Sequence, residues 1–166
     1  MELFFIRHGI AIDREDPNIA SDEERRLTKD GIEKMEQTAK GLARIVAGLD
    51  EIFSSPYARA KQTAEIVAKA FKPKPPISLV SGMAPGMTLE ILEGCAEKHS
   101  AGASLAFVGH EPDMSRMISL LVTGGDHCGF DMKKGAVACV GVESQAALGA
   151  GVLLWLLQPK HLRKIC

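Results

Sequence analysis

Three short stretches of this sequence carry side chains that could bind and transfer a phosphoryl group. They contain Arg7, His8 and Gly9 in RHG, Arg59 in SSPYARAKQTAE, and His110 in FVGHEPDMS. A guanidinium matches a phosphate edge with paired hydrogen bonds, and a helix N-terminus adds free N–H groups and partial positive charge. A neutral imidazole is a nucleophile at pH 7, and a phosphohistidine intermediate divides a difficult transfer into two easier steps. If these stretches meet, they predict a phosphate site with histidine chemistry.

The arginines and one histidine suit the stabilisation of negative charge. Phosphoryl transfer requires a protein mainly to position the reacting groups and to neutralise charge on the phosphoryl oxygens. Arg7, Arg59 and a protonated His110 fit that task. Gly9 has no side chain, so we expect the backbone to approach the phosphate closely there. Each residue alone has an ordinary explanation at a surface or a helix end, so only their meeting in the fold would make a site.

Apolar runs that alternate with helical patterns must position these residues. The pattern predicts strands over residues 3–6, 51–53, 77–80, 105–108, 136–142 and 152–157. It predicts helices after the start signals Thr28, Ser55-Pro56, Thr88 and Glu111-Pro112. Apolar residues recur every three or four positions from residue 32 to residue 49, which indicates one face of an amphipathic helix. No helix is evident between the last two strands, so these can form an antiparallel pair.

This order of elements predicts an α/β fold, with a mostly parallel central sheet between two layers of helices. The 166 residues contain no repeat, low-complexity linker or domain boundary, so we expect a single domain over residues 1–166. Ligands of open α/β sheets bind where strands end at their carboxyl side. Arg7 and His8 follow one predicted strand and His110 follows another, while Arg59 lies in the first turn of a helix after a third. We therefore expect them in one crevice.

Composition excludes several other functions. Lys and Arg number 20 and Asp and Glu number 21, so nothing attracts nucleic acid or an anionic membrane in bulk. Four cysteines, at positions 95, 128, 139 and 166, form no C-x-x-C pair, which favours reduced thiols over structural zinc. The N-terminus has no basic leader, and GVLLWLL is too short to cross a bilayer. We expect a cytoplasmic protein with no cofactor.

The motifs resemble those of a known family. An RHG after an N-terminal strand, SSPYARAKQTAE and a late GHEP resemble the histidine phosphatase (phosphoglycerate mutase-like) superfamily. Over its whole length the chain is similar to the SixA-type phosphohistidine phosphatases, with RRLTKDG, KKGAVACV and WLLQPKHL as supporting stretches. Two positions depart from the SixA pattern: Ile10 stands where aspartate is common, and Arg26 precedes Leu27 without an intervening proline.

The resemblance implies a role for each candidate residue. His8 would be the nucleophile that becomes phosphorylated. Arg7 and Arg59 would bind the phosphoryl group, and His110 would stabilise charge in the transition state. Together with Gly9, Glu111 completes the phosphate-binding set that we expect. The implied fold is the three-layer, phosphoglycerate mutase-like domain.

The stretch from Arg59 to His110 indicates which branch of the superfamily is closest. Mutases and acid phosphatases of the superfamily place long insertions there, whereas this stretch is occupied by predicted helices and a strand, which leaves no lid. It also lacks an obvious general acid, because Glu90 and Glu93 belong to a predicted helix. An imidazole leaving group accepts a proton readily and needs that acid less. Both features favour a phosphohistidine displayed on a protein as substrate.

The expected activity is therefore a metal-independent protein phosphohistidine phosphatase that releases phosphate. The SixA likeness implies a histidine phosphotransfer domain of a signalling relay as the partner. A phosphomonoesterase for small esters, with Asp13 or Glu111 as its acid, is the nearest alternative. A non-catalytic phosphoprotein-binding module is the alternative from another class. A metal-dependent hydrolase is disfavoured, because no carboxylates stand at ligand spacing near His8 or His110.

Overall fold

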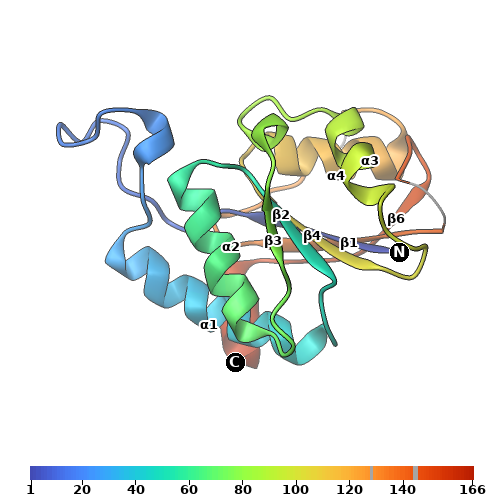
Figure 1. Ribbon diagram of the computed structural model, residues 1–166, viewed down its shortest axis with the longest axis horizontal. Helices are drawn as coiled ribbons and strands as arrows, with labels where there is room; N and C mark the ends of the chain where they lie inside the picture. Colours follow the sequence, from blue (N-terminus) through green and yellow to red (C-terminus); the bar gives the residue numbers. More distant parts are fainter. Residues whose placement is uncertain (128, 144–145) are drawn as a thin grey trace.

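Six strands form one mixed sheet in the computed structural model of the protein, which describes residues 1–127, 129–143 and 146–166 (Figure 1). The strands are β1 (Glu2–Arg7), β2 (Glu51–Ser54), β3 (Ile77–Leu79), β4 (Ser104–Gly109), β5 (Val137–Val142) and β6 (Gly151–Leu157). Their order across the sheet is β3-β2-β4-β1-β5-β6. The first four run parallel, while β5 is antiparallel to both β1 and β6. The expected parallel sheet with a final antiparallel pair is confirmed.

Five α-helices cover the two faces of this sheet in the described residues. They are α1 (Lys29–Ile45), α2 (Ala58–Ala70), α3 (Leu89–Ala96), α4 (Asp113–Thr123) and α5 (Pro159–Ile165). Two short 3-10 turns, η1 (Asp22–Glu24) and η2 (Ser81–Met83), lie in the connections. Between α2 and β4 the described chain holds only β3, η2 and α3, so the stretch expected to lack a lid has no further element.

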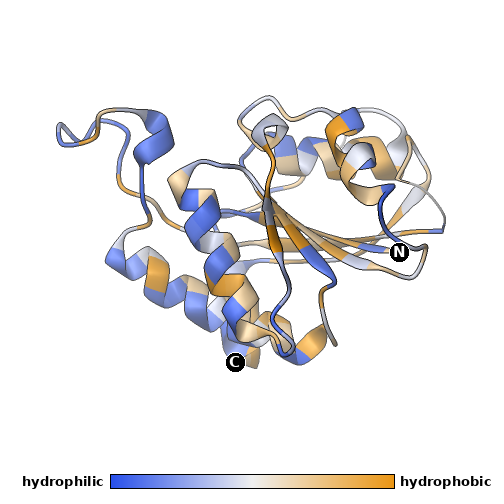
Figure 2. Ribbon diagram, in the orientation of Figure 1, coloured by the Kyte–Doolittle hydropathy of each residue, from blue (hydrophilic) through white to orange (hydrophobic). Residues whose placement is uncertain are grey.

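Strand β1 shows why the sheet is buried on both sides. Phe4 and Ile6 pack against α1, α2 and α5, whereas Leu3 and Phe5 point to the opposite face and pack with α3 and α4. Successive side chains of a strand alternate between faces, so a continuous apolar run is suited to the centre of a three-layer fold. Figure 2 shows this apolar run as orange strands between helices whose outward turns are blue. Strand β1 can therefore carry its last residues into the interior.

Helix α1 begins as expected and ends earlier than its apolar pattern suggests. The Thr28 side chain accepts a hydrogen bond from the Gly31 amide at 2.9 Å and caps the helix. The helix ends at Ile45, and Val46 is already extended. Val46 and Leu49 are nevertheless buried, because the extended chain continues across the same apolar layer. Periodicity alone does not distinguish a helical core residue from one that packs just after the helix.

Two helices differ from the sequence-based expectation: α2 begins later than predicted, and α5 was not predicted. Ser55 is not the N-cap of α2, since the helix begins at Ala58 with Tyr57 in the cap position, two residues later than expected. The C-terminal helix α5 was not predicted, although Pro159 stands at its first position. Its Leu162 packs on α1, where a side chain at Gly41 would meet the Leu162 carbonyl oxygen. The glycine thus permits a close approach of two helices that are distant in sequence.

Candidate active site

Three of the predicted site residues meet at the carboxyl end of the parallel strands. His8 follows β1, His110 follows β4, and Arg59 lies in the first turn of α2 after β2. Their exposed fractions are only 6%, 3% and 4%. The His8 and His110 rings face each other with centroids 5.2 Å apart. The structure therefore brings the two histidines and one arginine of the motifs into a single buried cluster.

His8 is held with a proton on one ring nitrogen and a lone pair on the other. Its Nδ1 lies 2.7 Å from the Gly9 carbonyl oxygen, to which only an N–H can donate. Arg59 Nε lies 3.3 Å from His8 Nε2 and donates to it. Both contacts require the tautomer with the proton on Nδ1 and the lone pair on Nε2. Nucleophilic attack would therefore come from Nε2.

Burial keeps His8 uncharged. Loss of solvation lowers the pKa of His8 to about 3; the hydrogen bond to the Gly9 carbonyl opposes this shift, and the charges of His110, Arg59 and Arg7 add to it. The imidazole is therefore neutral at physiological pH, as a nucleophile must be.

His110 differs from expectation in its charge. Its Nε2 pairs with Ser55 Oγ at 2.8 Å, and the Tyr57 ring packs edge-on at 5.2 Å between centroids. Burial first and the charge of Arg59 second lower the pKa of His110 to about 4. The sequence suggested a protonated His110, whereas the free site leaves it neutral. The reason is that a buried position and the charges of three arginines, Arg59, Arg25 and Arg7, disfavour a further positive charge.

Arg59 already holds an anion from its own chain. Its Nη2 donates to Asp22 Oδ2 at 2.9 Å and its Nη1 to the Asp22 carbonyl at 2.6 Å. Burial raises the pKa of Asp22, but the hydrogen bond and charge of Arg59, with help from Arg25 and Arg14, hold it lower, at about 2. The segment around η1 reaches the N-terminal end of α2 in Figure 1, which brings this carboxylate to the arginine. Asp22 therefore occupies the part of Arg59 that a phosphoryl oxygen would use.

Three buried polar atoms have no partner in the described part of the chain, and all three belong to predicted site residues. They are Arg7 Nε, His110 Nδ1 and Glu111 Oε1. Arg7 is fixed by a bond from Nη1 to the Met132 carbonyl at 2.6 Å, and Glu111 Oε2 accepts from Ser115 at 2.6 Å. Buried polar atoms are normally paired, so such a cluster marks a place where a ligand supplies the missing partners. Burial also raises the pKa of Glu111, which makes its carboxyl group easier to protonate.

Gly9 supports the site in a different way from the one expected. Its amide donates to Thr63 Oγ1 at 3.0 Å, so this N–H is not free for a phosphate. Thr63 in turn donates to the Arg59 carbonyl at 2.7 Å. A Cβ at Gly9 would lie 3.2 Å from Leu27, which is tighter than usual side-chain contact. The absence of a side chain at Gly9 therefore permits close packing against Leu27, while the backbone bond to Thr63 ties the RHG segment to α2 beside Arg59.

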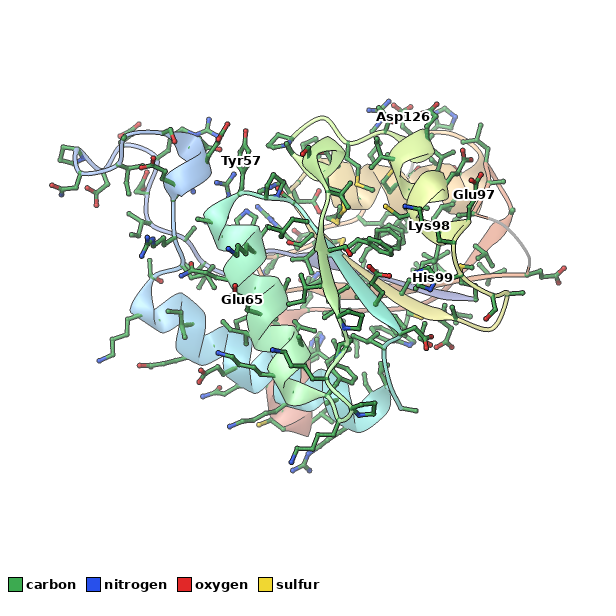
Figure 3. The ribbon with its side chains drawn as sticks, viewed as in Figure 1. Tyr57, Glu65, Glu97, Lys98, His99 and Asp126 are labelled. Carbon is green, nitrogen blue, oxygen red and sulfur yellow. The ribbon has the colours of Figure 1, made fainter. Side chains whose placement is uncertain are left out.

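Sequence reasoning missed four residues that shape the site: Asp22, Ser55, Tyr57 and Thr63. Tyr57 places its ring under the Arg59 guanidinium at 5.1 Å, and Figure 3 shows it at the N-terminal end of α2. A helical signal was available for Thr63, because it follows Arg59 by four positions and shares its face. No local pattern points to Asp22, which reaches Arg59 across 37 positions.

Other titratable residues lie elsewhere. Glu90 and Glu93 line clefts with Cys95 and His99 respectively, away from the two site histidines. His127 and His161 are exposed. Cys95, Cys139 and Cys166 are free thiols, and Cys128 lies outside the described residues.

In the ranges that the structure describes, no three His, Cys, Asp or Glu side chains gather to hold a metal ion, and no helix is long and apolar enough to span a membrane.

The sequence matches a known family model and a relative. The family model of the histidine phosphatase superfamily (branch 1) matches residues 3–84, which include Arg7, His8 and Arg59. An uncharacterized protein of Picosynechococcus sp. is 36% identical over 150 residues, covering 89% of this chain and 87% of its own. The chain belongs to the histidine phosphatase superfamily. Membership of this superfamily indicates a phosphatase.

Solved structures of differently named phosphatases show the same fold. The protein histidine phosphatase SixA, complexed with tungstate, matches with a TM-score of 0.82 and 24% identity, over 98% of this chain and 99% of that one. A phosphoserine phosphatase of Entamoeba histolytica, in complex with 3-phosphoglyceric acid, matches with a TM-score of 0.71 and 19% identity, over 97% and 98%. This histidine phosphatase therefore has the phosphoglycerate mutase-like fold, and at these identities the likeness extends to the fold alone.

Proposed function

We propose that the protein is a phosphohistidine phosphatase, which removes phosphate from a phosphohistidine on another protein through a phosphohistidine of its own. The observation that carries the proposal is the state of His8: neutral, with its Nε2 lone pair turned toward Arg59 and its ring beside His110. A protein that only bound phosphate would need positive charge at this point rather than an uncharged nucleophile. This argues against a non-catalytic binding module.

Substrate binding would begin with an exchange of anions on Arg59. A phosphoryl oxygen replaces Asp22 Oδ2 on Nη2, while other oxygens accept from the unpartnered Arg7 Nε and from His110. The phosphoryl dianion favours the charged form of a neighbouring imidazole, so His110 gains a proton once substrate is bound. This reconciles a neutral His110 in the free site with a positive charge in the reaction.

The transfer then takes two balanced steps. His8 Nε2 donates its electron pair to phosphorus as the bond from phosphorus to the substrate imidazole breaks, and that imidazole takes a proton from the surrounding water. In the second step, water attacks the phosphohistidine, the phosphorus–Nε2 bond returns its electrons to His8, and inorganic phosphate leaves. Arg7 and Arg59 neutralise the equatorial oxygens throughout. None of these steps requires a metal ion.

Two structural features support a phosphohistidine over a phosphate ester. The stretch between α2 and β4 adds no lid in the described chain, which suits a side chain displayed on a protein. Its carboxylates, Glu90, Glu93 and Glu97, line other clefts, so this stretch supplies no acid to an alkoxide. An imidazole leaving group is protonated readily near neutral pH and needs no such acid.

The small-ester alternative is favoured by one observation. Glu111 combines a raised pKa with an unpartnered buried Oε1 beside the phosphate site, as a proton donor to a leaving alkoxide would. Under that alternative, Glu111→Gln would abolish turnover of small esters. Under a phosphohistidine mechanism, the same variant would retain most of its activity on phosphohistidine.

The decisive experiment compares two substrates in the presence of a chelator. One is a histidine phosphotransfer domain carrying phosphohistidine, and the other is a small aryl phosphate. We expect rapid loss of phosphate from the domain, slow loss from the ester, and no loss with His8→Ala. Preference for the ester would establish the alternative, and a requirement for metal would overturn the mechanism.

A further inference from the structure

A cleft of about 490 Å³ lies directly beside the proposed phosphate site. Its walls are α1, the turn at residues 133–135 and the beginning of α5, and it includes Arg7 and Gly9 of the RHG segment. Figure 1 shows α1 beside the C-terminal helix, and residues of both helices line this cleft. The phosphate site and the cleft are therefore neighbours that share the Arg7 side chain.

The rim of this cleft is strongly basic. It carries Arg7, Lys34, Lys133, Lys134 and Arg163, and none of its lining residues in the described ranges is Asp or Glu. The whole chain has a net charge of −1, so five cations without a lining carboxylate are a local concentration of charge. We call this feature the basic cleft.

Most of these charges are free to meet a partner. Lys34 forms an exposed pair with Asp30 at 2.8 Å, an arrangement that contributes little stability. Lys133, Lys134 and Arg163 form no ion pair with any residue that the structure describes. Like charges held close together repel, so an anionic partner would relieve a cost that the free protein carries.

The two lysines are held in fixed register with the catalytic segment. The Gly135 amide donates to the carbonyls of Arg7 at 3.0 Å and His8 at 3.2 Å. Gly135 has a φ of +86°, a left-handed conformation that other residues rarely adopt. The turn therefore presents Lys133 and Lys134 at a constant distance from His8, as a docking contact for a substrate would need.

We infer that the basic cleft binds an acidic segment of the phosphorylated protein while its phosphohistidine lies against His8. This inference rests on the proposed function. A cleft of this volume exceeds a single phosphate, and its lining includes Met35 and Pro159 as well as the five cations. An acidic protein surface with some apolar side chains would complement both the cations and the apolar groups of the cleft. At low salt, electrostatic attraction would also steer such a partner to the site.

The test uses a charge reversal and a matched control. Lys133→Glu/Lys134→Glu reverses two rim charges outside the catalytic cluster. Lys40→Glu/Lys69→Glu makes the same change at exposed positions of a separate groove between α1 and α2. The value of kcat/KM is measured for the phosphorylated phosphotransfer domain and for an aryl phosphate over a range of salt concentrations.

We expect the rim variant to lose about tenfold in kcat/KM on the phosphoprotein at low salt, with a weaker salt dependence. Its activity on the aryl phosphate should stay within about twofold of wild type, and so should both activities of the control variant. Equal losses on both substrates would assign the lysines to the phosphate site instead. No loss on the phosphoprotein, or an equal loss in the control, would overturn the docking role.

The same assay separates this inference from the proposed function. If the wild-type protein acts on the aryl phosphate and leaves the phosphoprotein intact, the proposed function and the docking role both fail. If the wild type dephosphorylates the phosphoprotein and the rim variant does so equally well, only the docking role fails.

Discussion

Two histidine environments at opposite ends of the sheet differ in a way that separates a reactive site from a structural contact. His8 and His110 stand at the carboxyl ends of β1 and β4, whereas His99 precedes β4, at its amino end, as Figure 3 shows. His99 Nε2 bonds Glu51 at 3.0 Å and the ring packs edge-on against Phe53. His99 is therefore half-buried and paired.

The two environments differ in the buried polar atoms that they leave without a hydrogen-bond partner. His99 has a carboxylate partner, while His110 keeps a buried Nδ1 with none and shares its pocket with the unpartnered Arg7 Nε. A buried polar atom without a hydrogen-bond partner destabilises the free protein, so such atoms are found where a bound ligand supplies the missing partner. Unpaired polar atoms around a neutral imidazole therefore identify the reactive end better than the presence of histidine does.

The largest expected effect follows from replacing the nucleophile. His8→Ala should lower phosphatase kcat by at least roughly 1,000-fold, because no other group can form the phosphoenzyme. His99→Ala should stay within about twofold of wild type. Both rates are measured under saturating substrate, with circular dichroism to verify folding. A residual His8→Ala rate near that of wild type would remove the contrast between the two ends.

Acid should destabilise the protein through its buried histidines. The folded-state pKa values of His8 and His110, about 3 and about 4, lie below the ordinary 6.5, so the unfolded chain binds protons first as pH falls. The free energy of unfolding should therefore fall by about 1.4 kcal/mol per pH unit for each histidine, beginning below pH 6.5. For both together, this is roughly a hundredfold change in the folding equilibrium per unit.

Urea denaturation at several pH values measures that slope. His110→Asn should remove about half of it between pH 6 and pH 4. A slope that is unchanged in this variant would show that His110 does not titrate as a buried neutral group.

The pH dependence of kcat should show a fall on the alkaline side. In the bound state the reaction needs neutral His8 and protonated His110; because the pKa of His8 is lowered to about 3, His8 stays neutral over the measured range, and kcat should fall about tenfold per pH unit above the pKa of His110 in the complex. Turnover of the phosphoprotein is measured under saturating conditions from pH 5 to pH 9. A flat profile over this range would contradict opposite protonation states for the two histidines.

The smallest effect concerns the anion that Arg59 holds in the free site. Asp22→Asn weakens the competitor of the phosphoryl group, so inorganic phosphate should inhibit the variant a few-fold more strongly than wild type. The inhibition constant is compared with that of Asp30→Asn, which removes an exposed carboxylate elsewhere. Weaker inhibition would mean that Asp22 orients Arg59 for the phosphate rather than competing with it.

The sequence pattern was sufficient to predict the architecture and the proximity of the three motifs in the fold. Strands β1 and β4 are continuous apolar runs because both of their faces are buried. Parallel strands place their carboxyl ends at the same edge of the sheet. His8, Arg59 and His110 could therefore be expected together without coordinates. The general roles of these residues follow from side-chain chemistry, which is a property of each residue type.

The remaining features depend on contacts between distant parts of the chain. Asp22 on Arg59, Ser55 on His110 and α5 against α1 join residues that no local period relates. The charge of His110 could not be read from its type, because a pKa depends on solvation and neighbouring charges in three dimensions. The basic cleft likewise exists only where α1, the 133–135 turn and α5 converge beside Arg7. Local propensity sets the elements, whereas desolvation and long-range packing set the state of the groups that react.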